Sequence, residues 1–146
     1  MTCVTTLLEP RWEAPVPAGD GGLSILVVDD NSVNLHLASR MLSRMGHRVS
    51  LASNGRLAIA MFATRRYDFV LMDLNMPDMG GVAAATAIRK LFPQSCARIV
   101  AFTATDDDWE RKQCRAAGMA GFLTKPISRK DLANELGRLC AGVAIQ

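Results

Sequence analysis

The sequence predicts an open, doubly wound α/β sheet in which five parallel strands alternate with helices that cover both faces. Beyond residue 22, short apolar runs and segments of helical periodicity take turns five times. The runs are apolar at nearly every position, as expected of strands buried on both faces, and right-handed crossovers between such strands make the sheet parallel. Acidic, hydroxyl and basic residues follow several of these runs, so we expect the chemistry at one edge of the sheet.

The first two strand–helix units lie between residues 24 and 64. A strand is predicted over Ser24–Val28, and a helix follows over Val33–Met45, where Gly46 ends it. The next strand is predicted over His47–Ala52, and the apolar residues of Gly55–Thr64 fall on one helical face. Each unit therefore runs from an apolar strand into an amphipathic helix.

The other three units repeat this pattern. The predicted strands cover Phe69–Met72, Arg98–Phe102 and Gly121–Leu123, and the predicted helices cover Gly81–Phe92, Asp107–Ala117 and a last segment that begins near Ser128. Pro93 ends the first of these helices. Acids at the start of the second suit the positive end of a helix, and Ser128 with Asp131 has capping-box spacing at the start of the third.

Length and composition are typical of one globular domain. The 146 residues are 49% hydrophobic and 21% charged, which suffices for a core without a disulfide or a structural metal. The net charge of +3 is too small and dispersed for a nucleic-acid surface, and no apolar run is long enough to span a membrane. The four cysteines have no metal-ligand or disulfide spacing. We expect a cytoplasmic protein that contacts neither nucleic acid nor membrane directly.

Residues 1–22 are predicted to be a linker or the remnant of a preceding domain. Three prolines and three glycines lie between Glu9 and Gly22 with little apolar content. Ahead of them, Cys3–Leu8 alternates loosely, as a strand would. The globular domain is accordingly placed at residues 23–142.

The candidate site lies where the predicted strands end. Asp29 and Asp30 follow the first strand, Asp73 the third, Thr103 the fourth, and Lys125 lies just past the fifth. Carboxyl ends of parallel strands meet at one edge of a sheet, so the three carboxylates should lie close together and repel one another unless they are protonated or hold a cation. Oxygen ligands without nearby Cys or His favour Mg²⁺ or Mn²⁺ over zinc.

The same side chains suit a phosphoryl group. Phosphoryl transfer needs an ionised nucleophile, a metal ion and hydrogen-bond donors, which Asp73, the divalent ion, Thr103 and Lys125 would supply. Each residue also has an ordinary interpretation, such as a helix cap for Asp29 and Asp30, a turn for Asp73 or a solvated surface position for Lys125. Only a shared site explains all of them together.

Four short motifs, taken together, resemble the receiver domain of two-component response regulators. They are Val27–Asn31, Leu71–Pro77, Phe102–Ala104 and Leu123–Pro126. Their order and spacing agree with that family over roughly residues 23–140. The resemblance implies a flavodoxin-like sheet of strand order 2-1-3-4-5 and a phosphoacceptor domain, in which Asp73 takes a phosphoryl group from phosphohistidine and loses it slowly by autodephosphorylation.

The resemblance also assigns the metal ligands. Asp30 and Asp73 would bind Mg²⁺ or Mn²⁺ directly, together with the backbone carbonyl of Asn75, while Asp29 would act mainly through water. The ion would be needed for phosphoryl transfer.

Other positions of the same motifs imply phosphoryl binding and a switch. Thr103, the backbone of Ala104 and Lys125 would bind the phosphoryl group. Thr103 would move toward the phosphorylated aspartate, and Phe122 would then turn inward, which would alter a partner-binding face. The Lys125–Pro126 peptide bond would be cis, an isomer that proline makes accessible.

Two arrangements of the parent protein remain open. Asn31, Asn34 and the pairs Gly46–His47 and Asn54–Gly55 resemble receivers carried by hybrid sensor histidine kinases, so the chain is interpreted as part of one. One form of this interpretation makes it the cytoplasmic part of a membrane-bound sensor. The alternative is a stand-alone response regulator. The implied partners are a histidine kinase or a histidine phosphotransfer domain, and a weak homodimer is a further alternative.

Two other functions compete with a phosphoacceptor. A phosphohydrolase of the haloacid dehalogenase type also uses an aspartate after an apolar strand, but it needs a second acid two residues later, where this chain has Asn75. A receiver that only binds partners would leave the acidic pocket unused, which the intact set of motifs argues against. We therefore expect a signalling domain and not an enzyme with its own substrate.

Overall fold

The computed structural model describes residues 22–140, so the predicted linker (apart from Gly22) and the strand expected at Cys3–Leu8 lie outside the described residues. The elements are β1 (Ser24–Val28), α1 (Ser32–Arg44), β2 (Arg48–Ala52), α2 (Gly55–Thr64), β3 (Phe69–Asp73), α3 (Gly81–Leu91), β4 (Arg98–Thr103), α4 (Asp108–Ala116), β5 (Gly121–Thr124) and α5 (Arg129–Cys140). All the strand pairs are parallel, and the order is β2-β1-β3-β4-β5. The predicted fold class and strand order are confirmed.

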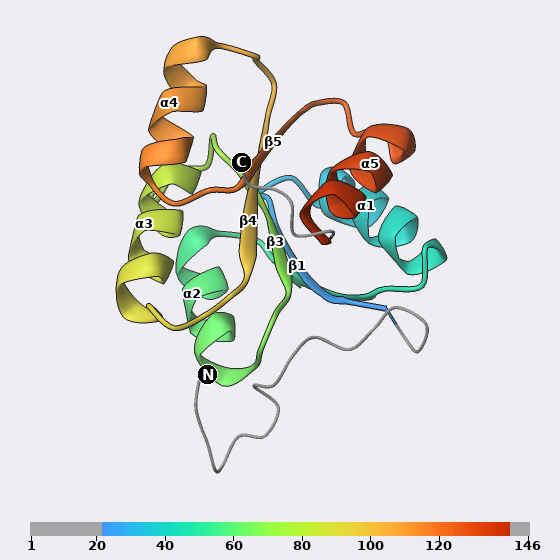
Figure 1. Ribbon diagram of the computed structural model, residues 1–146, viewed down its shortest axis with the longest axis horizontal. Helices are drawn as coiled ribbons and strands as arrows, with labels where there is room; N and C mark the ends of the chain where they lie inside the picture. The colour runs from blue at the N-terminus through green and yellow to red at the C-terminus, as the bar shows by residue number, and fades with distance from the viewer. Residues whose placement is uncertain (1–21, 141–146) are drawn as a thin grey trace.

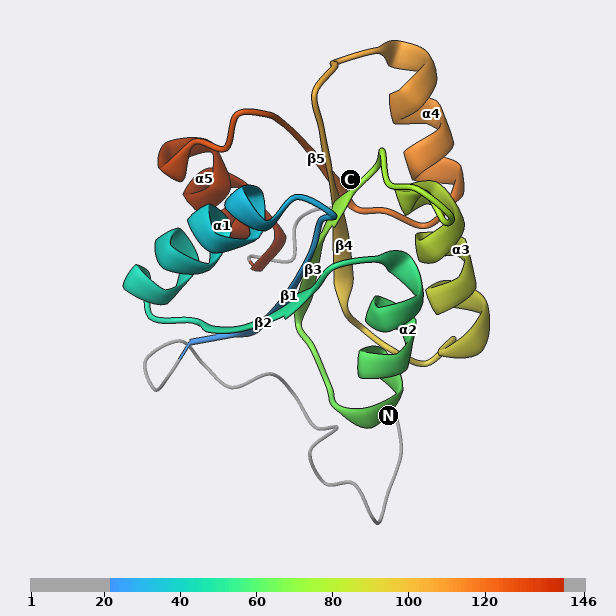
Figure 2. The same cartoon turned by 180° about the vertical axis from the view of Figure 1, so that it is seen from behind.

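Helices cover the sheet on both faces and enclose two cores. Figures 1 and 2 show α1 and α5 on one face and α2, α3 and α4 on the other. Side chains of a strand alternate between faces, so Ile25 and Val27 pack toward α1 and α5, while Leu26 and Val28 pack toward the other three helices. This two-sided burial explains why β1 is apolar at every position after Ser24. No helix within residues 22–140 is long and apolar enough to cross a membrane.

The strands extend further than the apolar runs that predict them. β3 includes Asp73, which pairs with Phe102 of β4, and β4 includes Thr103, which pairs with Thr124 of β5. Backbone pairing with a neighbouring strand continues past the last apolar side chain, so these polar residues belong to the rigid sheet and not to the loops that follow it. The outer strands β2 and β5 are only partly buried, unlike the fully buried β3.

The helix after the first acid pair is capped by neither acid. The side chain of Asn31 accepts hydrogen bonds from the backbone N–H groups of Val33 (2.8 Å) and Asn34 (3.2 Å), so it is Asn31 that begins α1. Asp29 instead accepts a hydrogen bond from the N–H of Asn31 at 2.9 Å. The capping interpretation of Asp29 and Asp30 is therefore wrong, because neither carboxylate caps the helix.

The start of α3 lies close against the end of β3 because residue 81 is glycine. A Cβ atom at Gly81 would meet the backbone oxygen of Asp73 and would lie 2.8 Å from the Cα of Leu74. The N–H of Gly81 donates to the carbonyl of Leu74 at 3.0 Å, which fixes this approach. The loop after Asp73 is thereby held next to the strand end that carries it.

This approach predicts opposite effects for alanine at two helical glycines. Gly81→Ala should destabilise the fold by about 1 to 3 kcal/mol, because the new methyl group collides with backbone that has no rotamer to change. Gly137→Ala should stabilise it by about 0.5 to 1 kcal/mol, because no atom would contact a Cβ there and alanine favours a helix. Urea unfolding of both variants measures the two changes, and equal effects would contradict the packing described at Gly81.

Candidate functional site

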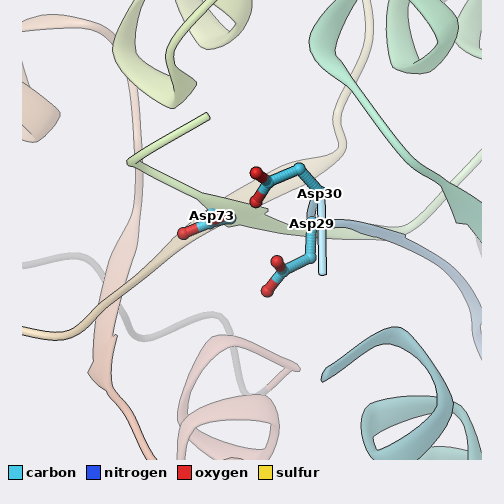
Figure 3. Close-up of side chains that lie close together, drawn as sticks. All are labelled: Asp29, Asp30 and Asp73. Carbon is cyan, nitrogen blue, oxygen red and sulfur yellow. The ribbon is translucent and has the colours of Figure 1, made fainter. Parts of the chain in front are cut away.

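Three carboxylates meet at the carboxyl end of the sheet. Asp29 and Asp30 follow β1, Asp73 ends β3, and one oxygen of each lies within 4.8 Å of an oxygen of the other two. Figure 3 shows the three side chains extending from these neighbouring strand ends. Asp29 and Asp73 are each 1% exposed, whereas Asp30 is exposed to solvent. The topology therefore brings the three predicted acids together, two of them buried.

Lys125 contacts the two buried acids. Its Nζ donates a hydrogen bond to Asp73 Oδ1 at 3.1 Å and lies 3.3 Å from Asp29 Oδ2. The backbone N–H of Lys125 donates to the carbonyl of Thr103 at 2.7 Å, which ties the loop after β5 to the end of β4. The Lys125–Pro126 peptide bond is cis. The predicted lysine thus lies at the acids, with its backbone attached to the sheet.

The site shifts the pKa of Asp73 upward. Burial of the carboxylate raises the pKa from 3.8 to about 6; the charge of Asp29 adds to this, while the hydrogen bond and charge of Lys125 oppose it. For Lys125, burial disfavours the ammonium, but the hydrogen bond from its Nζ to Asp73 and the charges of Asp73 and Asp29 outweigh this, so its pKa lies above its usual value. Near neutral pH, Asp73 is therefore an anion that the fold makes more basic than an ordinary aspartate.

The donor set suits a hard divalent cation. Oδ2 of Asp29 is buried and accepts no hydrogen bond from the described residues, although the Lys125 ammonium is near it. Three carboxylates beside one ammonium carry an excess of two negative charges, which a divalent ion would neutralise. Carboxylate oxygens without a thiol or an imidazole are ligands that Mg²⁺ prefers. The residues present therefore fit the expected ion.

Three further predicted residues lie around the acids. Thr103 is fully buried at the end of β4, and Ala104 is exposed directly after it. The N–H of Asn75 donates to Asp73 Oδ1 at 3.4 Å, so the loop after β3 folds back onto the carboxylate. The roles expected for the carbonyl of Asn75 and the N–H of Ala104 stay predictions.

Phe122 lies on β5, away from the acids. It is partly buried and packs against the core under α2, α3 and α4. The guanidinium of Arg111, from α4, lies 4.4 Å from the centre of its ring, within the range of a cation–π contact, and Arg111 also forms an ion pair with Asp106 at 2.7 Å. Phe122 thus contacts α4 through Arg111, a contact that the sequence did not indicate, and its role as a switch stays a prediction.

Sequence reasoning also missed Glu110, on the first turn of α4. Its Oε1 accepts hydrogen bonds from the hydroxyls of Thr105 (2.9 Å) and Thr103 (3.4 Å). An acid in the first turn of a helix is common because it complements the helix dipole, so its sequence position carries no signal for this contact.

Comparison with known proteins identifies relatives among sensor kinases. Sensor histidine kinase AruS of Pseudomonas aeruginosa is 34% identical over 131 residues, covering 88% of this chain and 13% of AruS. Virulence sensor protein BvgS of Bordetella bronchiseptica is 35% identical over 154 residues, covering 96% of this chain and 12% of BvgS. The chain therefore spans only about an eighth of the length of these relatives.

Solved structures and a family match agree with these relatives. Chemotaxis protein CheY4 of Vibrio cholerae superposes with a TM-score of 0.76 at 29% identity, over 80% of this chain and 97% of CheY4. The signal receiver domain of a histidine kinase from Syntrophus aciditrophicus gives a TM-score of 0.74 at 25% identity, over 86% of this chain and 95% of that domain. Residues 25–137 match the response regulator receiver domain family. The chain thus belongs to the receiver domains of two-component signalling and is homologous to those of hybrid histidine kinases.

Proposed function

We propose that this receiver domain accepts a phosphoryl group on Asp73 from phosphohistidine in a Mg²⁺-dependent reaction. The observation that carries the proposal is the contact of the Lys125 ammonium with buried Asp73 inside the cluster of three acids. A nucleophilic carboxylate, a site for a divalent cation and a cation that can bind a phosphoryl oxygen are the parts that phosphoryl transfer needs.

The reaction forms an acyl phosphate. A carboxylate oxygen of Asp73 attacks phosphorus, the bond from phosphorus to the donor imidazole nitrogen breaks, and the imidazole keeps the electron pair and takes up a proton. Even with its pKa raised to about 6 in the metal-free site, Asp73 is ionised near neutral pH, as the attack on phosphorus requires. Bound Mg²⁺, held by Asp30, Asp73 and the carbonyl of Asn75, with Asp29 acting through water, would screen the negative charge that gathers as the phosphoryl group arrives.

Lys125 would change partner during the reaction. Before transfer, its ammonium pairs with Asp73 and Asp29. Once Asp73 is phosphorylated it no longer carries a carboxylate charge, so we propose that the ammonium binds a phosphoryl oxygen instead, with the Thr103 hydroxyl and the Ala104 N–H as further donors. Phe122 would follow Thr103 inward, and water would slowly hydrolyse the acyl phosphate.

We further propose that residues 23–142 are one receiver unit of a hybrid sensor kinase and that this unit lies in the cytoplasm. Its phosphoryl donor would be a histidine kinase or a histidine phosphotransfer domain. The relatives AruS and BvgS, of which this chain matches only a small part, support this arrangement. A stand-alone regulator is the alternative, and reading the coding sequence around this chain for a kinase core distinguishes the two.

Phosphorylation is tested with a small donor. Incubation with Mg²⁺ and acetyl phosphate should add one phosphoryl group, because the nucleophile and its cationic neighbour belong to this chain. Asp73→Asn should abolish the addition, whereas Asp131→Asn, which changes an exposed acid on α5, should not. Intact-protein mass spectrometry measures the addition. No uptake by the wild type, or equal uptake by Asp73→Asn, would contradict the proposal, and multiple turnover of a phosphate ester would favour a phosphohydrolase.

Magnesium binding is tested by thermal unfolding. Millimolar Mg²⁺ should raise the Tm of the wild type, because an ion that binds only the folded state stabilises it. Asp30→Asn should weaken the ion's apparent affinity by about tenfold or more, since it removes an exposed ligand without opening the core. Asp108→Asn, an exposed acid on α4, is the control. If Mg²⁺ changed neither Tm nor the NMR signals around Asp73, the domain would act as a binding module that leaves its acids unused.

The raised pKa of Asp73 predicts a pH-dependent stability without Mg²⁺. Between the ordinary value of 3.8 and about 6, the folded state binds more protons than the unfolded state, so this group's contribution falls as pH rises through that window. Asp73→Asn carries no such charge and should become more stable than the wild type by roughly 1 to 3 kcal/mol above pH ~6. Urea unfolding in EDTA across that range measures the gap, and a gap independent of pH would refute the burial effect.

A further inference from the structure

We propose that Glu110 is a positioning residue that holds the Thr103 hydroxyl in its resting orientation and so opposes phosphorylation of Asp73. This inference rests on the proposed function, because it concerns the donor that Thr103 would supply to the phosphoryl group. It assigns to α4 a direct part in setting how readily the site accepts its ligand.

Glu110 lies in the first turn of α4, next to the loop that follows β4. Its Oε1 accepts a hydrogen bond from the Thr105 hydroxyl at 2.9 Å and a longer one from the Thr103 hydroxyl at 3.4 Å. The neighbouring cation, Arg111, pairs with Asp106 at 2.7 Å. The glutamate side chain is therefore oriented by two threonine hydroxyls, that of Thr103 at the end of β4 and that of Thr105 in the loop that follows.

The Thr103 hydroxyl has only one proton to donate. In this structure it donates to Glu110, while its oxygen accepts the N–H of Thr105 at 3.4 Å. A hydroxyl engaged in this way cannot also donate to a phosphoryl oxygen on Asp73. Binding of the phosphoryl group must therefore break the contact between Thr103 and Glu110 before Thr103 can contribute.

Burial strengthens the constraint. Thr103 is fully buried, so a hydroxyl that leaves Glu110 needs another acceptor and cannot simply turn to solvent. Oxygens of the phosphoryl group would provide that acceptor. The Thr103 hydroxyl then has two alternative acceptors, Glu110 on α4 and a phosphoryl oxygen on Asp73. Because it can donate to only one of them, a stronger bond to Glu110 weakens binding of the phosphoryl group.

Beryllofluoride, which mimics the phosphoryl group without transfer chemistry, tests this competition. In the presence of Mg²⁺, Glu110→Ala should bind beryllofluoride about 3- to 10-fold more tightly than the wild type, because the resting arrangement has lost its acceptor. Glu110→Gln keeps an oxygen acceptor without the charge, so its affinity for beryllofluoride should lie between those of the wild type and Glu110→Ala. Gln113→Ala, an exposed position on the same helix, should match the wild type. NMR titration measures beryllofluoride and Mg²⁺ affinities separately.

The direction in which Glu110→Ala changes beryllofluoride affinity distinguishes a positioning role of Glu110 from a purely structural one. If Glu110 served only to hold α4 together, its loss would weaken both beryllofluoride and Mg²⁺ binding, whereas the proposal predicts tighter beryllofluoride binding with Mg²⁺ affinity unchanged. In a Thr103→Ala background, the gain from Glu110→Ala should vanish, because the competition acts through that hydroxyl.

The outcomes also distinguish the two proposals. Failure of the wild type to bind beryllofluoride would overturn the proposed function and this inference with it. Binding by the wild type with no gain in Glu110→Ala, or a gain that persists without the Thr103 hydroxyl, would overturn the role of Glu110 alone.

Discussion

The central constraint on this structure is the burial of two carboxylates, Asp29 and Asp73, against a single ammonium, with Asp30 at their edge. Burying charges of like sign next to one another is unfavourable. Among residues 22–140, the carboxyl edge of the sheet is the one place where acidic side chains are buried. Two features reflect this crowding: the raised pKa of Asp73, and an Asp29 oxygen that accepts no hydrogen bond from residues 22–140 although the Lys125 ammonium is near it. We propose that this arrangement binds a divalent cation first and a phosphoryl group second.

The side chains of the site are held in place by the strands of the sheet. Asp73 and Thr103 are the last residues of paired strands, and Lys125 is attached to β4 through its backbone hydrogen bond to Thr103. Gly81 lets α3 approach the end of β3 without a collision. By contrast, Thr103 and Phe122, the groups that we propose to respond to phosphorylation, contact side chains of α4. Thr103 donates a hydrogen bond to Glu110, and the Phe122 ring lies against the guanidinium of Arg111. The acids thus lie at the strand ends, and the response that we propose lies at α4, which contacts the sheet through Glu110 and Arg111 as well as through buried Cys114.

Much of this arrangement could be predicted from the sequence. Five alternations of apolar run and helical period predicted the fold, and polar residues after four of the runs predicted the meeting of the acids with Lys125. Strand ends were placed one residue short at Asp73 and Thr103, because hydropathy does not register backbone pairing that continues under a polar side chain. The sequence offered Asp29 and Asp30 as caps of α1, whereas the cap is Asn31, because it is the Asn31 side chain that reaches the first free N–H groups of the helix. Glu110 could not be found, because its contact with Thr103 depends on how α4 packs beyond the loop.

The claim that a cation relieves the crowding of acids and leaves Asp73 to bind phosphorus is tested most directly by a crystal structure with Mg²⁺ and beryllofluoride. The account predicts beryllium bonded to an oxygen of Asp73, Mg²⁺ coordinated by Asp30 and Asp73 beside Asp29, and the Lys125 ammonium on a fluorine atom. A structure in which the three carboxylates diverge, with neither ligand between them at saturating concentrations, would contradict it.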